Sequence, residues 1–298
     1  LLLQFFFWRL YFQPHLQDGS GERAMAEGMV WLAVSCILLL LLVGLQAYFY
    51  LFRPYHNKVR ELKEAAEESK QAEHIRREFV ANVSHELKTP LTSISGFIET
   101  LQAGAAEDPE IRSRFIDIIA IETSRLKRLI EDLLVLSDIE NKRETEEKEF
   151  DVNEAIERTV EVLKPIAEEK DIRILLELDH DLHLSGSVDR FRQMMLNLIE
   201  NAIKYSYRGQ RIWVRALKKG SDIEVSVKDE GIGIAPEHHQ RLFERFYRVD
   251  KSRSKKVGGT GLGLSIVKHI AVLFGASLRV ESQVDQGATF YVTFHSRQ

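Results

Sequence analysis

The segment from residue 84 to residue 91, SHELKTPL, places an imidazole next to a carboxylate at His85 and Glu86. If the segment is helical, His85 points away from the apolar side, and Thr89 lies on the same face one turn later. One nitrogen of an exposed imidazole can attack phosphorus while a neighbouring carboxylate takes the proton from the other nitrogen. The pattern allows phosphoryl chemistry, although most exposed histidines have no catalytic role.

A second polar group lies on the predicted helix 189–205. The apolar residues of this helix cluster on one face, whereas Asn197, Asn201 and Lys204 lie together on the other. Amide oxygens can hold a divalent cation or its waters, and a lysine one turn on can neutralise phosphate charge. An ordinary solvated helix face would show the same residue types, so this group needs support from elsewhere.

Two glycine-containing segments follow. Asp229 comes directly after a predicted strand, and Gly231 and Gly233 allow close approach of the backbone. A carboxylate in such a place can accept a hydrogen bond from the exocyclic amine of adenine, although a simple turn would look similar. The segment 258–264, GGTGLGL, opens a predicted helix, so its backbone amides can cradle phosphate. Alone, it would often be only a flexible loop.

Between these segments, residues 242–250 read LFERFYRVD. The aromatic residues can pack, whereas the guanidinium of Arg248 can reach phosphate. The polar stretch 251–257 that follows is typical of a mobile lid.

The histidine segment belongs to a predicted helical hairpin. Asp108 and Pro109 are typical of the N-cap and first position of its second helix, and Gly104 of the end of its first. The apolar stripe of the first helix is Phe79, Val80, Val83, Leu87, Leu91, Ile94, Ile98 and Leu101, and that of the second is Ile111, Phe115, Ile118, Ile119, Leu126, Leu129, Leu133 and Leu136. These stripes are too wide for one another, which predicts a four-helix bundle in a homodimer. Glu122 lies inside the second stripe, where it would pair with Arg125 or mark the end of the bundle.

The C-terminal half changes from one helical pattern to alternating strands and helices. Strands are predicted at 173–178, 212–217, 223–227, 277–281 and 289–294, and helices at 153–169, 189–205 and 262–274. This order indicates an α/β sandwich with a mixed sheet against helices.

The N-terminal part contains an uncharged apolar run at 28–52, long enough to cross a bilayer as a helix. Basic residues follow at once, as at a cytoplasmic flank. A buried soluble helix is the alternative, but such helices keep a polar face. Residues 1–27 are either the remnant of a first membrane helix with a short loop, or a spurious segment before a true start at Met25. Residues 53–74 resemble a helical, coiled-coil-prone signal linker, with a solvated single helix as the alternative.

Composition narrows the function classes. The net charge of the 298 residues is only -4, which argues against a nucleic-acid partner. The single cysteine, Cys36, lies in the apolar run, so disulfide frameworks and cysteine-based zinc sites are excluded.

Taken in order, the five motifs resemble the H, N, G1, F and G2 boxes of two-component sensor histidine kinases. The resemblance covers 75–294 and implies a phosphoacceptor hairpin followed by a Bergerat-type ATP-binding domain. It implies that His85 is the phosphoacceptor, Glu86 its acid–base partner and Thr89 a phosphatase residue, and that Asn201 and Asn197 hold Mg²⁺. The implied nucleotide contacts are Asn197, Asn201, Lys204, Tyr205, Asp229, Gly231, Gly233, Arg248, Gly259, Thr260, Gly261, Leu262, Gly263 and Thr289.

The resemblance further implies an enzyme of the cytoplasmic membrane whose catalytic domains face the cytoplasm, and whose partners are a response regulator receiver domain, a second copy of itself and, through 28–52, membrane lipid. The expected division is 1–27, 28–52, 53–74, 75–140 for the hairpin, 141–149 for a charged linker and 150–298 for the ATP-binding domain. No outside sensor, HAMP or PAS module fits into 53–77. The motifs look most like those of the phosphate-regulon sensor branch. A Bergerat ATPase of the gyrase or chaperone kind, or a scaffold without catalysis, are the rival interpretations.

Overall fold

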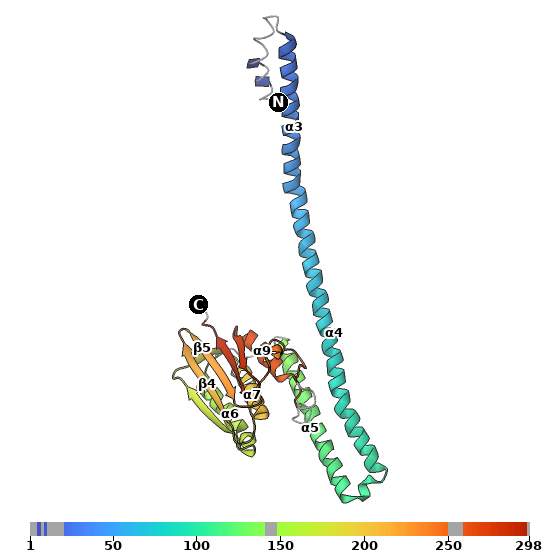
Figure 1. Ribbon diagram of the computed structural model, residues 1–298, viewed down its shortest axis with the longest axis vertical. Helices are drawn as coiled ribbons and strands as arrows, with labels where there is room; N and C mark the ends of the chain where they lie inside the picture. Colours follow the sequence, from blue (N-terminus) through green and yellow to red (C-terminus); the bar gives the residue numbers. More distant parts are fainter. Residues whose placement is uncertain (1–4, 7–8, 11–20, 141–147, 250–258, 297–298) are drawn as a thin grey trace. The chain divides into compact units, whose positions relative to one another are not determined.

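The computed structural model describes residues 5–6, 9–10, 21–140, 148–249 and 259–296 (Figure 1). The chain divides into two units between Arg77 and Glu78. In the first unit, helix α3 (Gly21–Ala47) passes into a short π-helix, η2 (Tyr48–Phe52). The stretch Met25–Tyr50 is the one described helix that is long and apolar enough to cross a membrane. The predicted span 28–52 therefore lies in a helical stretch, although its last residues form a π-helix.

Helix α4 (Arg53–Gln102) is a continuous helix of 50 residues and continues through Pro90. It contains the predicted signal linker and the first helix of the predicted hairpin. A short 3-10 helix, η3 (Ala105–Glu107), and helix α5 (Pro109–Glu140) follow. Within the second unit, α4 and α5 pack against each other. The rings of Phe97 and Phe115 are in contact there, with centroids 4.8 Å apart.

The turn between α4 and α5 has the predicted caps. Gly104 has a φ of +113°, a conformation that glycine adopts without strain. The Asp108 carboxylate accepts hydrogen bonds from the amides of Glu110 at 2.9 Å and Ile111 at 3.2 Å. This satisfies two of the free amides that begin α5. The predicted N-cap at Asp108 and the helix end near Gly104 are therefore confirmed.

The hairpin buries only part of its apolar surface. Leu129, Leu136 and Ile139 are buried. Other large apolar residues of the two helices remain exposed, namely Val80, Leu91, Ile98, Ile111, Ile116, Ile121, Ile130 and Leu134. The structure thus contains apolar faces that a single hairpin does not cover, as the width of the predicted stripes requires.

The C-terminal domain contains a five-stranded mixed sheet with the order β2-β4-β5-β7-β6. Strand β2 is parallel to β4, and the other neighbours are antiparallel. The strands are β2 (Arg173–Leu178), β4 (Arg211–Lys219), β5 (Asp222–Asp229), β6 (Ser277–Ser282) and β7 (Ala288–Phe294). A separate antiparallel pair joins β1 (Lys148–Asp151) to β3 (His183–Gly186).

Helices α6 (Val152–Glu169), α7 (Val188–Tyr205) and α9 (Gly263–Leu273) cover one face of this sheet (Figure 1). Burial alternates regularly along β7, in which Ala288, Phe290, Val292 and Phe294 point inward. Phe191 of α7 is fully buried and packs its ring against Phe150, Phe274 and Phe294. The predicted α/β sandwich is confirmed, with the three predicted helices and five predicted strands in place.

The structure differs from the sequence predictions in two elements. Strands β1 and β3 have four residues each and were not predicted. Because β1 begins at Lys148, it occupies the end of the stretch 141–149 that was predicted to be a linker. Residues 141–147 lie outside the described part of the chain.

Candidate active site

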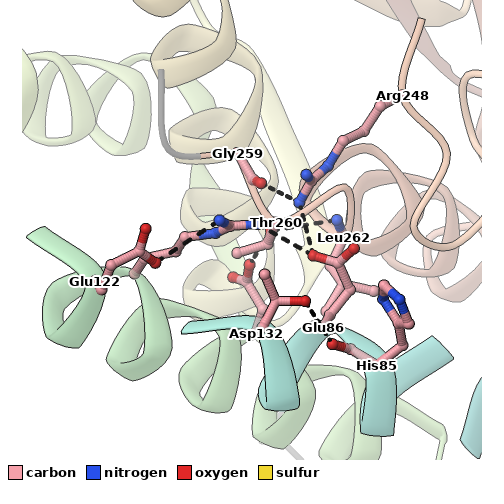
Figure 2. Close-up of polar contacts among 10 residues, drawn as sticks. His85, Glu86, Glu122, Asp132, Arg248, Gly259, Thr260 and Leu262 are labelled. Atoms are coloured by element: carbon pink, nitrogen blue, oxygen red, sulfur yellow. Dashed lines mark hydrogen bonds and ion pairs between the residues drawn. The ribbon is translucent and has the colours of Figure 1, made fainter. Parts of the chain in front are cut away.

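His85 and Glu86 lie side by side on α4, near the middle of the hairpin helix (Figure 2). The His85 side chain is exposed, as predicted, and Glu86 is half-buried. Thr89, on the following turn, donates a hydrogen bond from its hydroxyl to the carbonyl oxygen of His85 at 3.1 Å. The imidazole is therefore open to a reactant, and a carboxylate lies next to it in the sequence.

Two arginines contact the Glu86 carboxylate at the same oxygen, Oε2. Arg125 of α5 donates from 3.2 Å, and Arg248 of the C-terminal domain donates from 3.3 Å (Figure 2). The two guanidinium-bearing side chains are almost fully covered, with 7% of the Arg125 side chain and 6% of the Arg248 side chain exposed. Arg248 also donates to the carbonyl oxygen of Gly259. Burial lowers the pKa of Arg248, and the Glu86 charge acts in the opposite direction.

A second contact joins the hairpin to the glycine-rich segment. The Thr260 hydroxyl donates to Oδ2 of Asp132 on α5 at 2.6 Å (Figure 2). Burial raises the pKa of Asp132, and the hydrogen bond from Thr260 lowers it in part. Sequence analysis did not select Asp132, because a contact between residues 128 positions apart leaves no local pattern.

The polar side of α7 faces the start of α9. Asn197 is buried, and its Nδ2 donates to the Gln193 carbonyl at 2.9 Å, which leaves Oδ1 directed at Gly263. A Cβ at Gly263 would lie 2.9 Å from that oxygen and 3.9 Å from Nδ2 of Asn201. Only a glycine lets the helix start approach the two amides this closely. The predicted amide pair is therefore brought together with the glycine-rich segment.

Lys204 and Tyr205, at the end of α7, lie on the same side. A Cβ at Gly259 would be 3.1 Å from Lys204 Nζ and 3.8 Å from the Tyr205 hydroxyl. Burial lowers the pKa of Lys204 to about 8, and the positive charges of Arg128 and Arg248 act in the same direction, against Glu200. Lysine, tyrosine and arginine thus converge on the backbone of Gly259, and their side chains carry donors of the kind that bind phosphate oxygens.

Asp229 is the last residue of β5 and is buried. Its Oδ1 accepts hydrogen bonds from the amides of Gly231 at 2.8 Å and Ala288 at 3.2 Å. Burial raises the pKa of the Asp229 carboxyl, and these two bonds lower it in part. A Cβ at Gly231 would collide with the carbonyl oxygen of Tyr205. This glycine therefore lets the end of α7 lie against the buried carboxylate.

The remaining glycine-rich residues form the loop that precedes α9. The amide of Leu262 donates to the Thr260 hydroxyl at 3.3 Å, and Leu262 itself is buried. Gly261 has a φ of +77°, and its carbonyl accepts from the Phe246 amide at 2.9 Å. Gly233, which belongs to the segment after β5, lies against the backbone of Gln283. Gly258 and the predicted lid at 251–257 lie outside the described residues.

Thr289, a predicted nucleotide contact, lies on β7 beside the end of β5. Thr289 pairs in register with Lys228, the neighbour of Asp229, so its side chain points to the opposite face of the sheet from the Asp229 carboxylate. Ala288, one residue earlier, supplies the amide that binds Asp229. The assignment of Thr289 to the nucleotide site is therefore not supported, because side chains alternate along a strand.

The arrangement of these groups defines a class of protein. A buried carboxylate, a pair of amides, a lysine and a glycine-rich helix start surround one region of an α/β sandwich. This donor set suits a purine nucleotide with its phosphates. Beside it, a hairpin helix presents an exposed histidine. The class is an ATP-binding domain joined to a histidine-bearing helical hairpin.

Comparisons with known proteins agree with this class. Residues 75–142 match the family described as His Kinase A (phospho-acceptor) domain. Residues 186–298 match the family described as histidine kinase-, DNA gyrase B- and HSP90-like ATPase. The sensor-like histidine kinase SenX3 of Mycobacterium tuberculosis is 40% identical over 216 residues, which are 72% of this chain and 52% of SenX3. The sensor histidine kinase WalK of Bacillus subtilis is 38% identical over 227 residues, 73% of this chain and 36% of WalK.

Solved structures of histidine kinases are also similar to this chain. The histidine kinase ThkA, in complex with the response regulator protein TrrA, has a TM-score of 0.62 and 28% identity, and covers 78% of this chain and 66% of that one. The Acinetobacter baumannii histidine kinase AdeS, at 24% identity and a TM-score of 0.58, covers 72% of this chain and 98% of that one, and supports the fold alone. The chain spans about half the length of the SenX3 proteins. It belongs to the sensor histidine kinase family.

Proposed function

We propose that this chain uses ATP to phosphorylate His85 and then passes the phosphoryl group to an aspartate of a response regulator. The observation that carries the proposal is the exposed His85 next to Glu86, whose carboxylate contacts Arg248 at the edge of the nucleotide site. The relative ThkA was solved with a response regulator, which supports the choice of partner. The proposal includes a homodimer, a phosphatase activity and a membrane anchor formed by 28–52.

The proposed reaction assigns a role to each group. One imidazole nitrogen of His85 attacks the γ-phosphorus, the bond from that phosphorus to the ADP oxygen breaks, and Glu86 takes the proton from the other ring nitrogen. Arg248 and Lys204 bind phosphate oxygens and offset the negative charge that gathers there. Asp229 accepts from the adenine amine.

Asn197 and Asn201 are the residues that would hold Mg²⁺. The hydrogen bond from Asn197 Nδ2 to Gln193 fixes the amide, so an oxygen faces the start of α9, which fits a hard cation. Among the described residues, no group of three or more His, Cys, Asp and Glu side chains could hold a metal. When bound, the ion would offset phosphate charge and orient the γ-phosphoryl group.

The proposal is tested by incubating the chain with labelled ATP. We expect a phosphoryl group that is lost in acid and stable in base, because a phosphoramidate has this behaviour. His85→Gln should bind ATP as tightly as the wild type and give no phosphoprotein, since the nucleotide pocket and the acceptor lie in different domains. A phosphate retained on His85→Gln would overturn the assignment. Free phosphate release without any labelled protein would favour the gyrase-like ATPase, and ATP binding with neither would favour the scaffold.

A further inference from the structure

Arg125 is a buried cation inside the hairpin, on α5. Its side chain is 7% exposed and lies between two carboxylates of the same hairpin. A guanidinium is costly to bury, and the cost is offset only when it is paired. The other arginines of α5, Arg112, Arg114 and Arg128, are all exposed. The burial of Arg125 therefore needs a partner that holds it there.

The two partners of Arg125 differ in distance. Its Nη2 donates to Glu86 Oε2 at 3.2 Å, whereas its Nη1 lies 3.8 Å from Glu122 Oε2, beyond hydrogen-bond distance. Glu122 Oε2 is buried and accepts no hydrogen bond from the described residues. Glu122 therefore acts on Arg125 through charge, and Arg125 makes its direct contact with Glu86. This explains why Glu122 interrupts an apolar stripe.

Arg248 contacts the same Glu86 oxygen, but from the other domain. In the proposed reaction Arg248 is needed at a phosphate oxygen, so it must release Glu86 in whole or in part when ATP binds. Arg125 belongs to the hairpin that also carries His85, and it does not depend on how the ATP-binding domain is placed. It remains beside Glu86 when Arg248 leaves.

We propose that Arg125 is the positioning residue for Glu86: it holds the carboxylate in place while His85 attacks the γ-phosphorus, and Glu122 is its counterion. The proposal rests on the proposed function. In the step concerned, the proton passes from the imidazole to Glu86, the nitrogen–phosphorus bond forms and ADP leaves. Arg125 keeps its own protons throughout. A carboxylate without Arg125 would rotate among several positions, and fewer encounters with ATP would end in transfer.

The test uses the full chain in lipid nanodiscs, with Arg125→Gln, Arg125→Lys, Glu86→Gln and the Glu86→Gln/Arg125→Gln double variant. Arg114→Gln, which removes an exposed arginine of the same helix, is the matched control. The initial rate of phosphohistidine formation is measured at saturating ATP, and the Kd for a non-hydrolysable ATP analogue is measured separately. We expect Arg125→Gln to slow the rate by about tenfold or more, as the loss of an ordered acid–base group does, with Kd changed by less than about twofold.

Two further results identify the path through which Arg125 acts. The double variant should be as slow as Glu86→Gln alone, since an arginine that works only through Glu86 has nothing left to position. Arg125→Lys should recover much of the rate because it keeps the charge. If Arg125→Gln lowers the thermal midpoint, the rate of Arg125→Lys is compared with the wild-type rate instead. Losses that multiply in the double variant would assign Arg125 a merely structural role and overturn the inference. A normal rate in Arg125→Gln would do the same.

The outcome for the wild type separates this inference from the proposed function. If the wild-type chain forms no phosphohistidine, the proposed function fails first. If the wild type is labelled and Arg125→Gln is labelled equally fast, only the role of Arg125 fails.

Discussion

The ATP-binding domain and the helical hairpin bury their apolar residues to very different degrees. In the domain, Phe191, Ile199 and Ile212 are completely buried by other parts of the same chain. In the hairpin, Ile98 is 41% exposed and Leu134 is 61% exposed. Apolar surface removed from water is the main source of folding free energy. The domain can therefore be stable by itself, whereas the open faces of the hairpin would be covered in the proposed homodimer.

The polar groups of the proposed site are divided between the hairpin and the domain according to their role. The hairpin contributes the groups that would react, His85 and Glu86, and the domain contributes the groups that would hold the nucleotide. The described contacts between them include two polar pairs, Arg248 with Glu86 and Thr260 with Asp132, and a ring contact of Phe79 with Phe246, whose centroids are 5.9 Å apart. In the proposed reaction, phosphate oxygens would replace the contact of Arg248 with Glu86. Because the reacting groups and the nucleotide-holding groups lie in separate parts, we expect changes in one part to leave the other part folded.

The largest expected effect tests the domain. Asn201→Asp should reduce phosphohistidine formation by about a hundredfold or more, because a carboxylate changes the charge and geometry at a proposed metal site where positioning dominates phosphoryl transfer. Circular dichroism should be unchanged and the chain should still dimerise. Asn153→Asp, the same exchange on α6, should be labelled normally. Labelling of Asn201→Asp at close to the wild-type rate with Mg²⁺ and ATP would contradict the metal role.

The second prediction tests the hairpin. Ile98→Glu should raise the dimer dissociation constant by about a hundredfold, since it places a charge in an apolar face that we expect the second copy to cover. Binding of an ATP analogue should be unchanged because the nucleotide site lies wholly in the other domain. Analytical ultracentrifugation in detergent measures the first effect, and calorimetry the second. The control is Thr92→Glu, also exposed on α4 but about a third of a turn away around the helix. Equal weakening by both variants would mean that the exposed face is not the interface.

Elements with a local sequence pattern could be predicted, whereas elements that depend on distant partners could not. The long helices and the five-stranded sheet have periodic apolar patterns and recognisable caps, such as Asp108, so each is visible in a local window. Strands β1 and β3 have only four residues, and β1 carries the charged residues Lys148 and Glu149. Such strands form because they pair with each other across 30 or more positions in the chain, which no local pattern shows.

Site residues divide in the same way. Asn197, Asn201, Lys204 and Asp229 lie where their spacing predicted, because each is fixed by one helix or one strand end. Thr289 lies one position beyond Ala288, whose amide binds Asp229, and a step of one residue along a strand moves a side chain to the other face. The spacing along α5 predicts Arg125 only as a partner for Glu122. Its contact with Glu86, 39 positions away, depends on how two helices align, which the sequence alone does not specify.

A smaller effect concerns the pH dependence of nucleotide binding. Burial lowers the pKa of Lys204 to about 8, so its charge is lost as the pH rises through that value. The cationic form is the one that binds phosphate, so the affinity for ATP should be constant below pH 7 and fall by about tenfold by pH 9, where about a tenth of the lysine is protonated. Lys204→Arg should remove this dependence, because arginine keeps its charge. An identical pH profile in Lys204→Arg, measured by calorimetry, would mean that another group is responsible.

The smallest expected effect concerns Thr89, one turn after His85. Its hydroxyl donates to the His85 carbonyl, and its oxygen keeps the capacity to accept a hydrogen bond from water. We expect this water to be directed at a phosphoaspartate docked where His85 otherwise reacts. Thr89→Ala should therefore leave phosphohistidine formation nearly unchanged and slow the loss of phosphate from a purified phosphorylated regulator by several-fold, up to about tenfold.

The helix offers a matched control for this prediction. Thr100 makes the same kind of bond, from its hydroxyl to the carbonyl of Gly96 at 2.7 Å, but it lies more than three turns beyond His85. Thr100→Ala loses the same local hydrogen bond without touching the reactive face. If Thr89 serves only the backbone next to Pro90, Thr89→Ala and Thr100→Ala should lower the thermal midpoint alike, and kinase and phosphatase rates should fall together. A selective loss of phosphatase activity in Thr89→Ala alone would show that one face of the hairpin helix carries out both the forward and the reverse chemistry.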